Sequence, residues 1–162
     1  MEFVIKQSAL KEELGFVQGI VEKKSTIPVL SNILIESIGE GTIRIVGTDL
    51  DVTIRCEASA DIKQSGSMCI QARKLFDIVR LLENSDVHFT KEENEWVRLS
   101  CGKSKFRLAG VSRDQFPRSP RIPQHASEIV RQSFQPLYPT HEFCDNAGAI
   151  ALHPLRRKIY GR

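Results

Sequence analysis

Apolar residues between Ser67 and Gly110 follow two different periods. After a short apolar strand, Leu75, Ile78, Val79 and Leu82 recur at the spacing that stacks side chains on one face of a helix. Polar and apolar residues then alternate in three segments, which is typical of strands with one buried face. The inward pairs are Val87 and Phe89, Val97 and Leu99, and Phe106 and Leu108. This stretch therefore predicts a strand, an amphipathic helix and three further strands.

The first half of the chain repeats this plan, with a short strand at 3–5 and Ser8 as the candidate N-cap of a helix. Its helical positions are Leu10, Leu14, Val17 and Val21, and its inward strand pairs are Ile33 and Ile35, Ile43 and Ile45, and Val52 and Ile54. Ile5, Leu10 and Leu14 match Ile70, Leu75 and Val79 at one constant offset.

Such a repeat predicts an α+β fold in which two β-α-β-β-β copies lay both helices on one face of an antiparallel sheet. The two sheets could meet edge to edge or face to face. The alternative is chance similarity, because amphipathic patterns resemble one another in unrelated segments.

The composition is that of a globular protein, with 41% hydrophobic and 27% charged residues in a chain of 162. This length predicts one domain, with or without an appendage. No apolar run approaches the length of a membrane helix, and no signal peptide is visible at the N-terminus. Cys56, Cys69, Cys101 and Cys144 form no C-x-x-C motif, and we expect buried thiols at Cys69 and Cys101. We therefore expect a cytoplasmic protein without a membrane partner.

The net charge of +3 is unevenly distributed along the chain. Residues 1–116 hold 16 Lys and Arg against 17 Asp and Glu, a net charge of −1, whereas residues 117–162 hold 7 against 3, a net charge of +4. A domain that binds nucleic acid by charge alone is basic throughout or along a stripe. The first part could therefore contact DNA only through a local patch.

Two short cationic segments are candidates for such a patch. Lys23 and Lys24 follow the first predicted helix, where they either contact phosphate or simply compensate the helix dipole. Arg73 and Lys74 lie in the first turn of the second helix, where cations oppose the dipole. Asp77 is a possible partner for Arg73 or Arg80, and a solvated face is the alternative to a phosphate contact.

The last predicted strand carries cations on one face, Lys103, Lys105 and Arg107, and apolar Phe106 and Leu108 on the other. Alternating lysines protect an exposed sheet edge from unwanted pairing. The same pattern also suits a seam in which the cations meet acidic residues of a second subunit.

No catalytic or metal-binding constellation emerges from the sequence. Asp49 and Asp51 are better explained by turn chemistry than by a metal, and His141 with Cys144 is an isolated pair rather than a site. We therefore predict no catalytic residues, no metal and no cofactor.

Five motifs carry a specific resemblance: S-T-I-P-V-L-S-N-I-L-I-E, G-T-D-L-D, Q-A-R-K-L-F-D-I-V-R, K-S-K-F-R-L and D-Q-F-P. In this order and spacing they resemble the bacterial DNA polymerase III beta subunit family, the sliding clamps, over residues 1–117. One departure is Gln71, where the family usually has proline. The resemblance implies the N-terminal domain of a three-domain subunit. In the family, two subunits close a ring around duplex DNA, helices line the hole, and the ring tethers the polymerase without catalysing a reaction.

The resemblance also assigns residues. Lys24 and Arg73 match DNA-contacting arginines of the family, with Lys23 beside the former, and the subunit seam is implied at Lys74, Lys103, Lys105, Phe106 and Leu108. The implied partners are double-stranded DNA, a second clamp subunit, the DNA polymerase III core and the clamp loader. The pocket for polymerase and loader peptides lies between the family's second and third domains, which this chain lacks.

Residues 118–162 lack the alternation of the preceding part, and six of the seven prolines occur from Pro117 onward. The simplest interpretation is a proline-rich linker. Alternatively, back-translation of 144–160 read one base later permits A-I-T-Q-E-Q-S-R-Y-T-L-S-G-A-K-F, which resembles the start of the family's second domain. That hypothesis places a one-base slip near residues 117–124 and predicts a poorly packed or disordered tail. Sequencing the coding DNA across 115–136 tests it.

Two functions follow from these observations. The first is a processivity clamp represented here by its N-terminal domain, which is not expected to close a ring alone. The second is a stand-alone clamp-fold interaction domain whose basic tail, including Arg156, Arg157 and Lys158, binds nucleic acid.

Overall fold

The computed structural model describes residues 1–21, 27–117 and 158–161. Its two helices are α1 (Gln7–Val17) and α2 (Ala72–Val79). Its strands are β1 (Glu2–Lys6), β2 (Asn32–Ile38), β3 (Thr42–Thr48), β4 (Val52–Ser59), β5 (Asp61–Gln64), β6 (Ser67–Gln71), β7 (Asp86–Lys91), β8 (Trp96–Cys101), β9 (Ser104–Val111) and β10 (Lys158–Gly161). Short 3-10 turns occur at Pro28–Ser31, Glu93–Glu95 and Arg113–Gln115.

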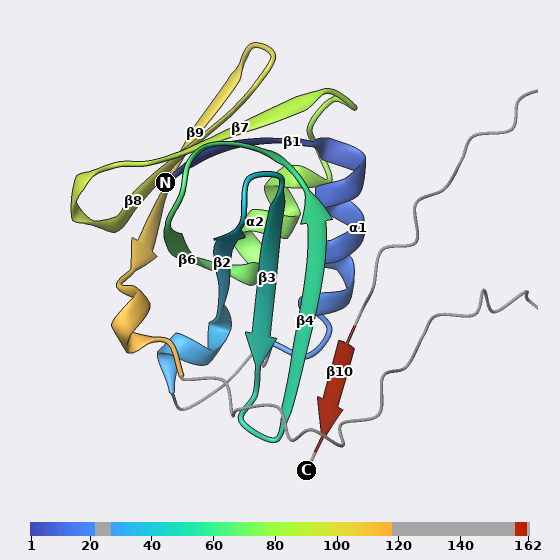
Figure 1. Cartoon of the computed structure of the whole chain (residues 1–162), viewed down its shortest axis with the longest axis vertical. Helices are drawn as coiled ribbons and strands as arrows, with labels where there is room; N and C mark the ends of the chain where they lie inside the picture. Colours follow the sequence, from blue (N-terminus) through green and yellow to red (C-terminus); the bar gives the residue numbers. More distant parts are fainter. Residues whose placement is uncertain (22–26, 118–157, 162) are drawn as a thin grey trace, which may run out of the picture.

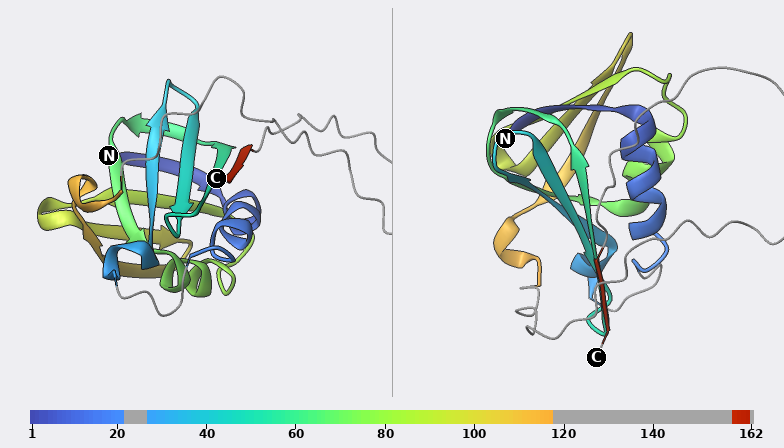
Figure 2. Two further views of the ribbon diagram at one scale, coloured as in Figure 1. Left: turned by 90° about the horizontal axis from the view of Figure 1, so that it is seen from below. Right: turned by 45° about the vertical axis from the view of Figure 1, so that its right-hand side comes forward.

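All of these strands form one antiparallel sheet in the order β10-β4-β3-β2-β6-β9-β8-β7-β1-β5. The two halves join edge to edge, because β6 pairs with β2 along its length and with β9 only at Cys69↔Val111 and Ile70↔Gly110. Both helices lie on one face of the curved sheet (Figures 1 and 2). The predicted α+β repeat is therefore confirmed, with edge-to-edge sheets. The first copy carries β5 in addition, which pairs with β1.

The main core lies between the helices and the sheet, and the predicted inward positions supply most of it. Its fully buried members include Ile5, Leu10, Leu14, Val17, Ile33, Ile35, Ile43, Ile45, Ile70, Leu75, Val79, Val87, Phe89, Val97 and Leu99. Phe3 and Phe89 stack with ring centroids 4.7 Å apart. Gly47 allows α1 to approach β3 closely, because a Cβ at this position would overlap Val17 Cγ1. Ile78 and Leu82 are half-buried against the same core, although Leu82, expected on the helix, lies after α2 has ended at Val79.

A smaller apolar cluster covers the opposite side of the central strands. Leu34, Val46, Cys69 and Phe116 pack together there, next to half-buried Val29 and Val111. The expected burial of Cys69 and Cys101 is confirmed, and Cys56 is buried as well. Burial raises the pKa of the Cys69 thiol to about 11, which nearby Arg113 and Lys91 only partly oppose.

Two local expectations for the first helix were wrong. The helix begins at Gln7, its N-cap is Lys6 with no side-chain cap, and Ser8 is exposed. Long-range hydrogen bonds of Gln7 fix the helix start instead of a local hydroxyl. The helix also ends at Val17, four residues before Val21, although Val21 is still buried in the turn that follows.

Candidate nucleic-acid interface and sheet edge

The two helices are held side by side by Gln7, which is 5% exposed. Its side-chain Nε2 donates a hydrogen bond to the Val79 carbonyl at 2.7 Å, at the end of α2. Its backbone N–H donates to the Ser85 carbonyl at 3.0 Å, in the loop before β7. Because these bonds join residues far apart in sequence, the start of α1 and the end of α2 form a single, fixed surface.

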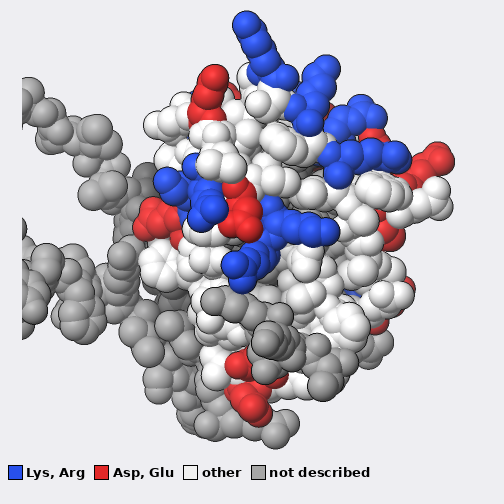
Figure 3. Space-filling model, turned by 180° about the vertical axis from the view of Figure 1, so that it is seen from behind, with Lys and Arg blue, Asp and Glu red and all other residues white. Residues whose placement is uncertain are grey.

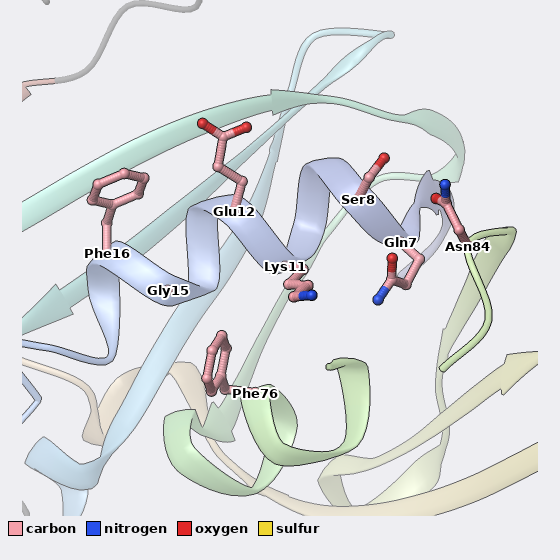
Figure 4. A pocket seen from close by; sticks show the side chains of 8 residues that line it. All are labelled: Gln7, Ser8, Lys11, Glu12, Gly15, Phe16, Phe76 and Asn84. Atoms are coloured by element: carbon pink, nitrogen blue, oxygen red, sulfur yellow. The ribbon is translucent and has the colours of Figure 1, made fainter. Parts of the chain in front are cut away.

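A groove of about 770 Å³ runs along this surface (Figure 4). It is lined by Gln7, Ser8, Lys11, Glu12, Gly15, Phe16, Phe76 and Asn84. Phe76 points from α2 toward α1, Lys11 is exposed on α1, and Phe16 is 41% exposed. Sequence reasoning did not single out Lys11 or Phe16. The sequence did contain a signal for them: both lie outside the apolar stripe of α1, which predicts an exposed position.

Cations on the helices belong mainly to α2 and the residue after it. Arg73 and Lys74 are exposed in the first turn of α2, as expected. Asp77 lies within ion-pair reach of both arginines, with Arg73 Nε 4.0 Å from Asp77 Oδ2 and Arg80 Nη2 3.5 Å from Asp77 Oδ1. The arginine side chains nevertheless stay 65% and 53% exposed. Such exposed pairs are weak, so both guanidinium groups can contact another anion.

In the space-filling view from behind, Lys and Arg side chains gather over the upper half, with Asp and Glu side chains among them (Figure 3). Lys23 and Lys24, the other candidates for DNA contact, lie outside the described residues, as do Arg156 and Arg157. Of the three proposed DNA-binding residues, the structure therefore locates only Arg73.

The second candidate surface is the edge of β9. This strand pairs with β8 from Ser104 to Ala109, whereas β6 contacts it only at Gly110 and Val111. Within the described part of the chain, residues 104–109 therefore present an unpaired edge. An open edge of this kind exposes N–H and C=O groups that another strand can bind.

Two apolar side chains lie along that edge. Phe106 is opposite Leu99 and Leu108 is opposite Val97, and both partners are fully buried. Directly opposed residues share a face, so Phe106 and Leu108 belong to the core-facing side. With no neighbouring strand beside it, Phe106 stays 36% exposed and Leu108 is half-buried. The predicted alternation is thus confirmed, but its apolar face is only partly covered.

The cations of the predicted seam are exposed, and they are divided between two elements. Lys103 and Lys105 lie in and just after the β8–β9 turn, and Lys74 lies on α2. Arg107 differs, because its Nε donates to Glu92 Oε2 at 2.9 Å and its guanidinium lies 4.6 Å from the centre of the Trp96 ring. Glu92 also pairs with Arg98. Sequence alternation alone could not separate Arg107 from the lysines, because its partners come from the preceding hairpin.

The Asp49–Asp51 segment is a turn, as expected. Asp49 Oδ1 accepts hydrogen bonds from the N–H groups of Asp51 at 3.0 Å and Val52 at 2.6 Å, and Leu50 has φ 82°. No group of three or more potential metal-ligating side chains occurs in residues 1–21, 27–117 and 158–161. Neither of the helices described above is long and apolar enough to cross a membrane.

Comparison with known proteins identifies the family. The profile of the DNA polymerase III beta subunit, N-terminal domain, matches residues 1–120. The chain belongs to this family. A beta sliding clamp of Chlamydia muridarum is 33% identical over 135 residues, covering 83% of this chain and 36% of that protein. A beta sliding clamp of Caulobacter vibrioides is 35% identical over 140 residues, covering 81% and 37%.

Solved clamp structures share the fold. The pol III beta structure of Caulobacter crescentus is 35% identical with a TM-score of 0.70 and covers 74% of this chain and 32% of its own. The sliding clamp of Bacillus subtilis is 29% identical with a TM-score of 0.74, covering 79% and 36%. The chain thus spans about a third of the length of the clamps it matches. The clamp resemblance and the fold expected from it are both confirmed.

Proposed function

We propose that this chain is the N-terminal domain of a sliding clamp, a non-catalytic processivity factor for DNA replication in the cytoplasm. The observation that carries the proposal is the clamp-family match over residues 1–120. The paired helices support it, because they form one surface on which the two arginines paired with Asp77 stay exposed.

In this proposal the helix face is turned toward duplex DNA. Arg73 contacts phosphate, with Lys11 and Arg80 nearby on the same pair of helices and Lys23 and Lys24 after α1. The weak charge of the domain suits this role, since residues 1–116 carry a net charge of −1. A ring that encloses DNA is retained by topology, and a strongly basic lining would slow its sliding.

The β9 edge is the proposed seam with a second clamp subunit. An incoming strand would pair with residues 104–109 and cover Phe106 and Leu108. Lys74, Lys103 and Lys105 would meet acidic residues of that subunit. Tethering of the DNA polymerase III core and the clamp loader is assigned to parts of the full-length clamp outside this domain.

Binding of the whole chain to a short labelled duplex, followed by fluorescence anisotropy as salt is varied, tests the DNA-facing assignment. We expect weak binding, with a Kd on the order of 10⁻⁴ M at physiological salt. The Arg73→Glu variant should bind several-fold more weakly, and the slope of log K against log salt should fall by about 1.

The matched control is Lys63→Glu, which makes the same charge change at an exposed position on β5 instead of on a helix. Its binding should change less than that of Arg73→Glu. Equal losses in both variants would show that the domain responds only to net charge, and the DNA-facing role of α2 would be wrong.

A further inference from the structure

The groove between α1 and α2 has an aromatic end that phosphate contacts alone do not use. Phe76 points from α2 toward α1, and Phe16 lies next to Gly15 on α1 (Figure 4). Gly15 has no side chain to cover the Phe76 ring, although a Cβ at this position would lie only 3.8 Å from Phe76 Cε2. Phe16 is 41% exposed and Phe76 is half-buried. Two aromatic rings are therefore accessible at the same end of the groove.

The other end of the groove is polar. Gln7, Ser8 and Asn84 lie there (Figure 4), and Ser8 and Asn84 are exposed. Gln7 Nε2 is engaged by the Val79 carbonyl, so the Ser8 hydroxyl and the Asn84 amide are the groups that face solvent at this end. The groove volume of about 770 Å³ falls in the range of roughly 300–1,000 Å³ that is usual for small-ligand sites. Flat apolar surface at one end and hydrogen-bonding groups at the other suit a nucleic-acid base.

The charges around the groove favour an anionic occupant. Phe76 follows Arg73 by three residues and precedes Arg80 by four, the spacings that make residues neighbours on a helix surface. Its ring is therefore flanked by two guanidinium groups. The charged side chains at the surface of the two helices and at Arg80 give a net charge of +2, with four cations against two acids: Lys11, Arg73, Lys74 and Arg80 against Glu12 and Asp77.

Duplex DNA can use the cations of this surface but not its rings. The bases of a duplex are stacked on one another, so a duplex presents phosphates and base edges instead of base faces. The bases of a single strand can stack on aromatic side chains, and every base has a face that allows it.

We propose that the groove binds unpaired bases where a single strand leaves a duplex. The bases stack on Phe76 and Phe16, and the phosphates of the adjoining duplex lie beside Arg73. This role rests on the proposed contact of α2 with duplex DNA and adds a preference for a junction between duplex and single strand.

The test uses the full chain and two labelled duplexes of equal length, each with a two-nucleotide overhang. One overhang carries two adenines, and the other carries two abasic sites. Both probes have the same number of phosphates, so the ratio of their dissociation constants reports on the bases alone. Fluorescence anisotropy at low salt measures both constants, because charge-dependent binding is strongest there.

We expect the unaltered chain to bind the adenine overhang about fivefold more tightly than the abasic overhang. Phe16→Leu and Phe76→Leu should each bring this ratio toward one, because leucine keeps the apolar contacts but has no flat face. Gly15→Leu should do the same without altering a core residue, since its side chain would lie against the Phe76 ring.

Two further variants are controls. Phe16→Trp keeps an aromatic face at the same position and should retain the ratio. Leu81→Ala removes an apolar side chain that is 80% exposed just after α2, and it should retain the ratio as well. Loss of the ratio in Leu81→Ala would show that any exposed apolar residue has this effect, and the groove would have no special role.

Three other results would overturn the proposal. A ratio of one in the unaltered chain would mean that the bases make no contact, and the proposed role of α2 would still stand if Arg73→Glu weakened duplex binding more than Lys63→Glu. A ratio that survives Phe16→Leu, Phe76→Leu and Gly15→Leu would place the bases outside the groove. Binding of a blunt duplex that depends on Phe16 as strongly as binding of the overhang would make the duplex itself the occupant.

Discussion

The strands β4 and β9, each the third of the three alternating strands that follow the helix in its repeat copy, are equivalent in sequence pattern but have different surroundings. In β4, four of the eight residues are buried, including Ile54 at 9% exposure, and strands pair with it on both sides. In β9, residues 104–107 are all exposed, and one edge is open along most of its length. The same alternation therefore produces a strand with a buried inward face in one copy and a largely exposed strand in the other.

This difference shows that burial at the end of a repeat depends on what lies next to it. The interior strands of both copies have two neighbouring strands and a helix packed over them, so their inward residues are buried. The strand β9 has a neighbour along most of its length only on the β8 side, because β6 contacts it only at Gly110 and Val111, so its inward face is incompletely covered. Incomplete burial of Phe106 is thus a property of the edge and not of the residue.

The largest expected effect tests whether the two copies share one core. Leu10 and Leu75 occupy equivalent positions on α1 and α2, and both are fully buried. Leu10→Ala and Leu75→Ala should each lower the free energy of unfolding by about 2 to 5 kcal/mol, because each removes buried apolar atoms and leaves a cavity. Urea unfolding followed by circular dichroism measures both in the full chain.

Leu81→Ala provides the control, since this side chain is 80% exposed and its loss should change the unfolding free energy by no more than about 0.5 kcal/mol. If only one of the two core variants unfolds more readily, or if two separate transitions appear, the copies would be independent units and the shared core would be refuted.

The second prediction concerns the contrast between the terminal strands directly. Ile54→Ala on β4 should cost about 2 kcal/mol or more, because its side chain is almost fully buried. Phe106→Ala on β9 should cost less than about 1 kcal/mol in the monomer, since the larger side chain is already 36% exposed. The same urea measurement compares them, and a greater loss at Phe106 would mean that β9 is covered in solution.

The hydrophobic periodicity of the sequence predicted the helices and strands of the core. It did not predict features that depend on contacts between residues far apart in the chain. The stripe of Leu75 and Val79 and the alternation through Phe89 and Leu99 were enough to specify the helix and the strands of the core. The capping of α1 depends on Gln7 reaching Val79 and Ser85, which no local pattern records. The β10–β4 ladder likewise joins residues about a hundred positions apart.

The candidate site divides in the same way. The motif around Arg73 predicted a residue in the first turn of α2, and the alternation predicted that Phe106 shares a face with Leu108; the structure has both arrangements. Sequence could not show that Asp77 would lie beside both Arg73 and Arg80, or that Glu92 and Trp96 would engage Arg107, because each outcome depends on a rotamer or a hairpin register.

A third prediction uses Cys69 on β6, the strand that joins the two copies. Burial raises its thiol pKa from the ordinary value of 9.0 to about 11. Between these values the unfolded thiol loses its proton while the folded thiol keeps it, so the unfolded state binds fewer protons and stability falls as pH rises. Below pH 9.0 the thiol is protonated in both states, so the stability that Cys69 contributes is fully present.

Urea unfolding at intervals from about pH 8 to pH 11 measures the slope. Cys69→Ala should be somewhat less stable at neutral pH but should lose less stability over the alkaline range than the unaltered chain. Parallel pH profiles for the two proteins would show that Cys69 keeps an ordinary pKa and that the cluster with Phe116 is open to solvent.

The smallest expected effect distinguishes the two helices as charged surfaces. Asp77→Asn removes the acidic partner of Arg73 and Arg80 on α2, and the exposure of all three groups limits the stability change to less than about 1 kcal/mol. If α2 faces DNA, the two freed arginines should strengthen duplex binding in the anisotropy assay by about two- to fivefold. Glu40→Gln makes the same charge change in the exposed turn between β2 and β3, away from the helices. An equal gain from Glu40→Gln would show that the effect comes from net charge. A gain confined to Asp77→Asn would show that it comes from the surface of α2, which belongs to the same repeat copy as the open β9 edge.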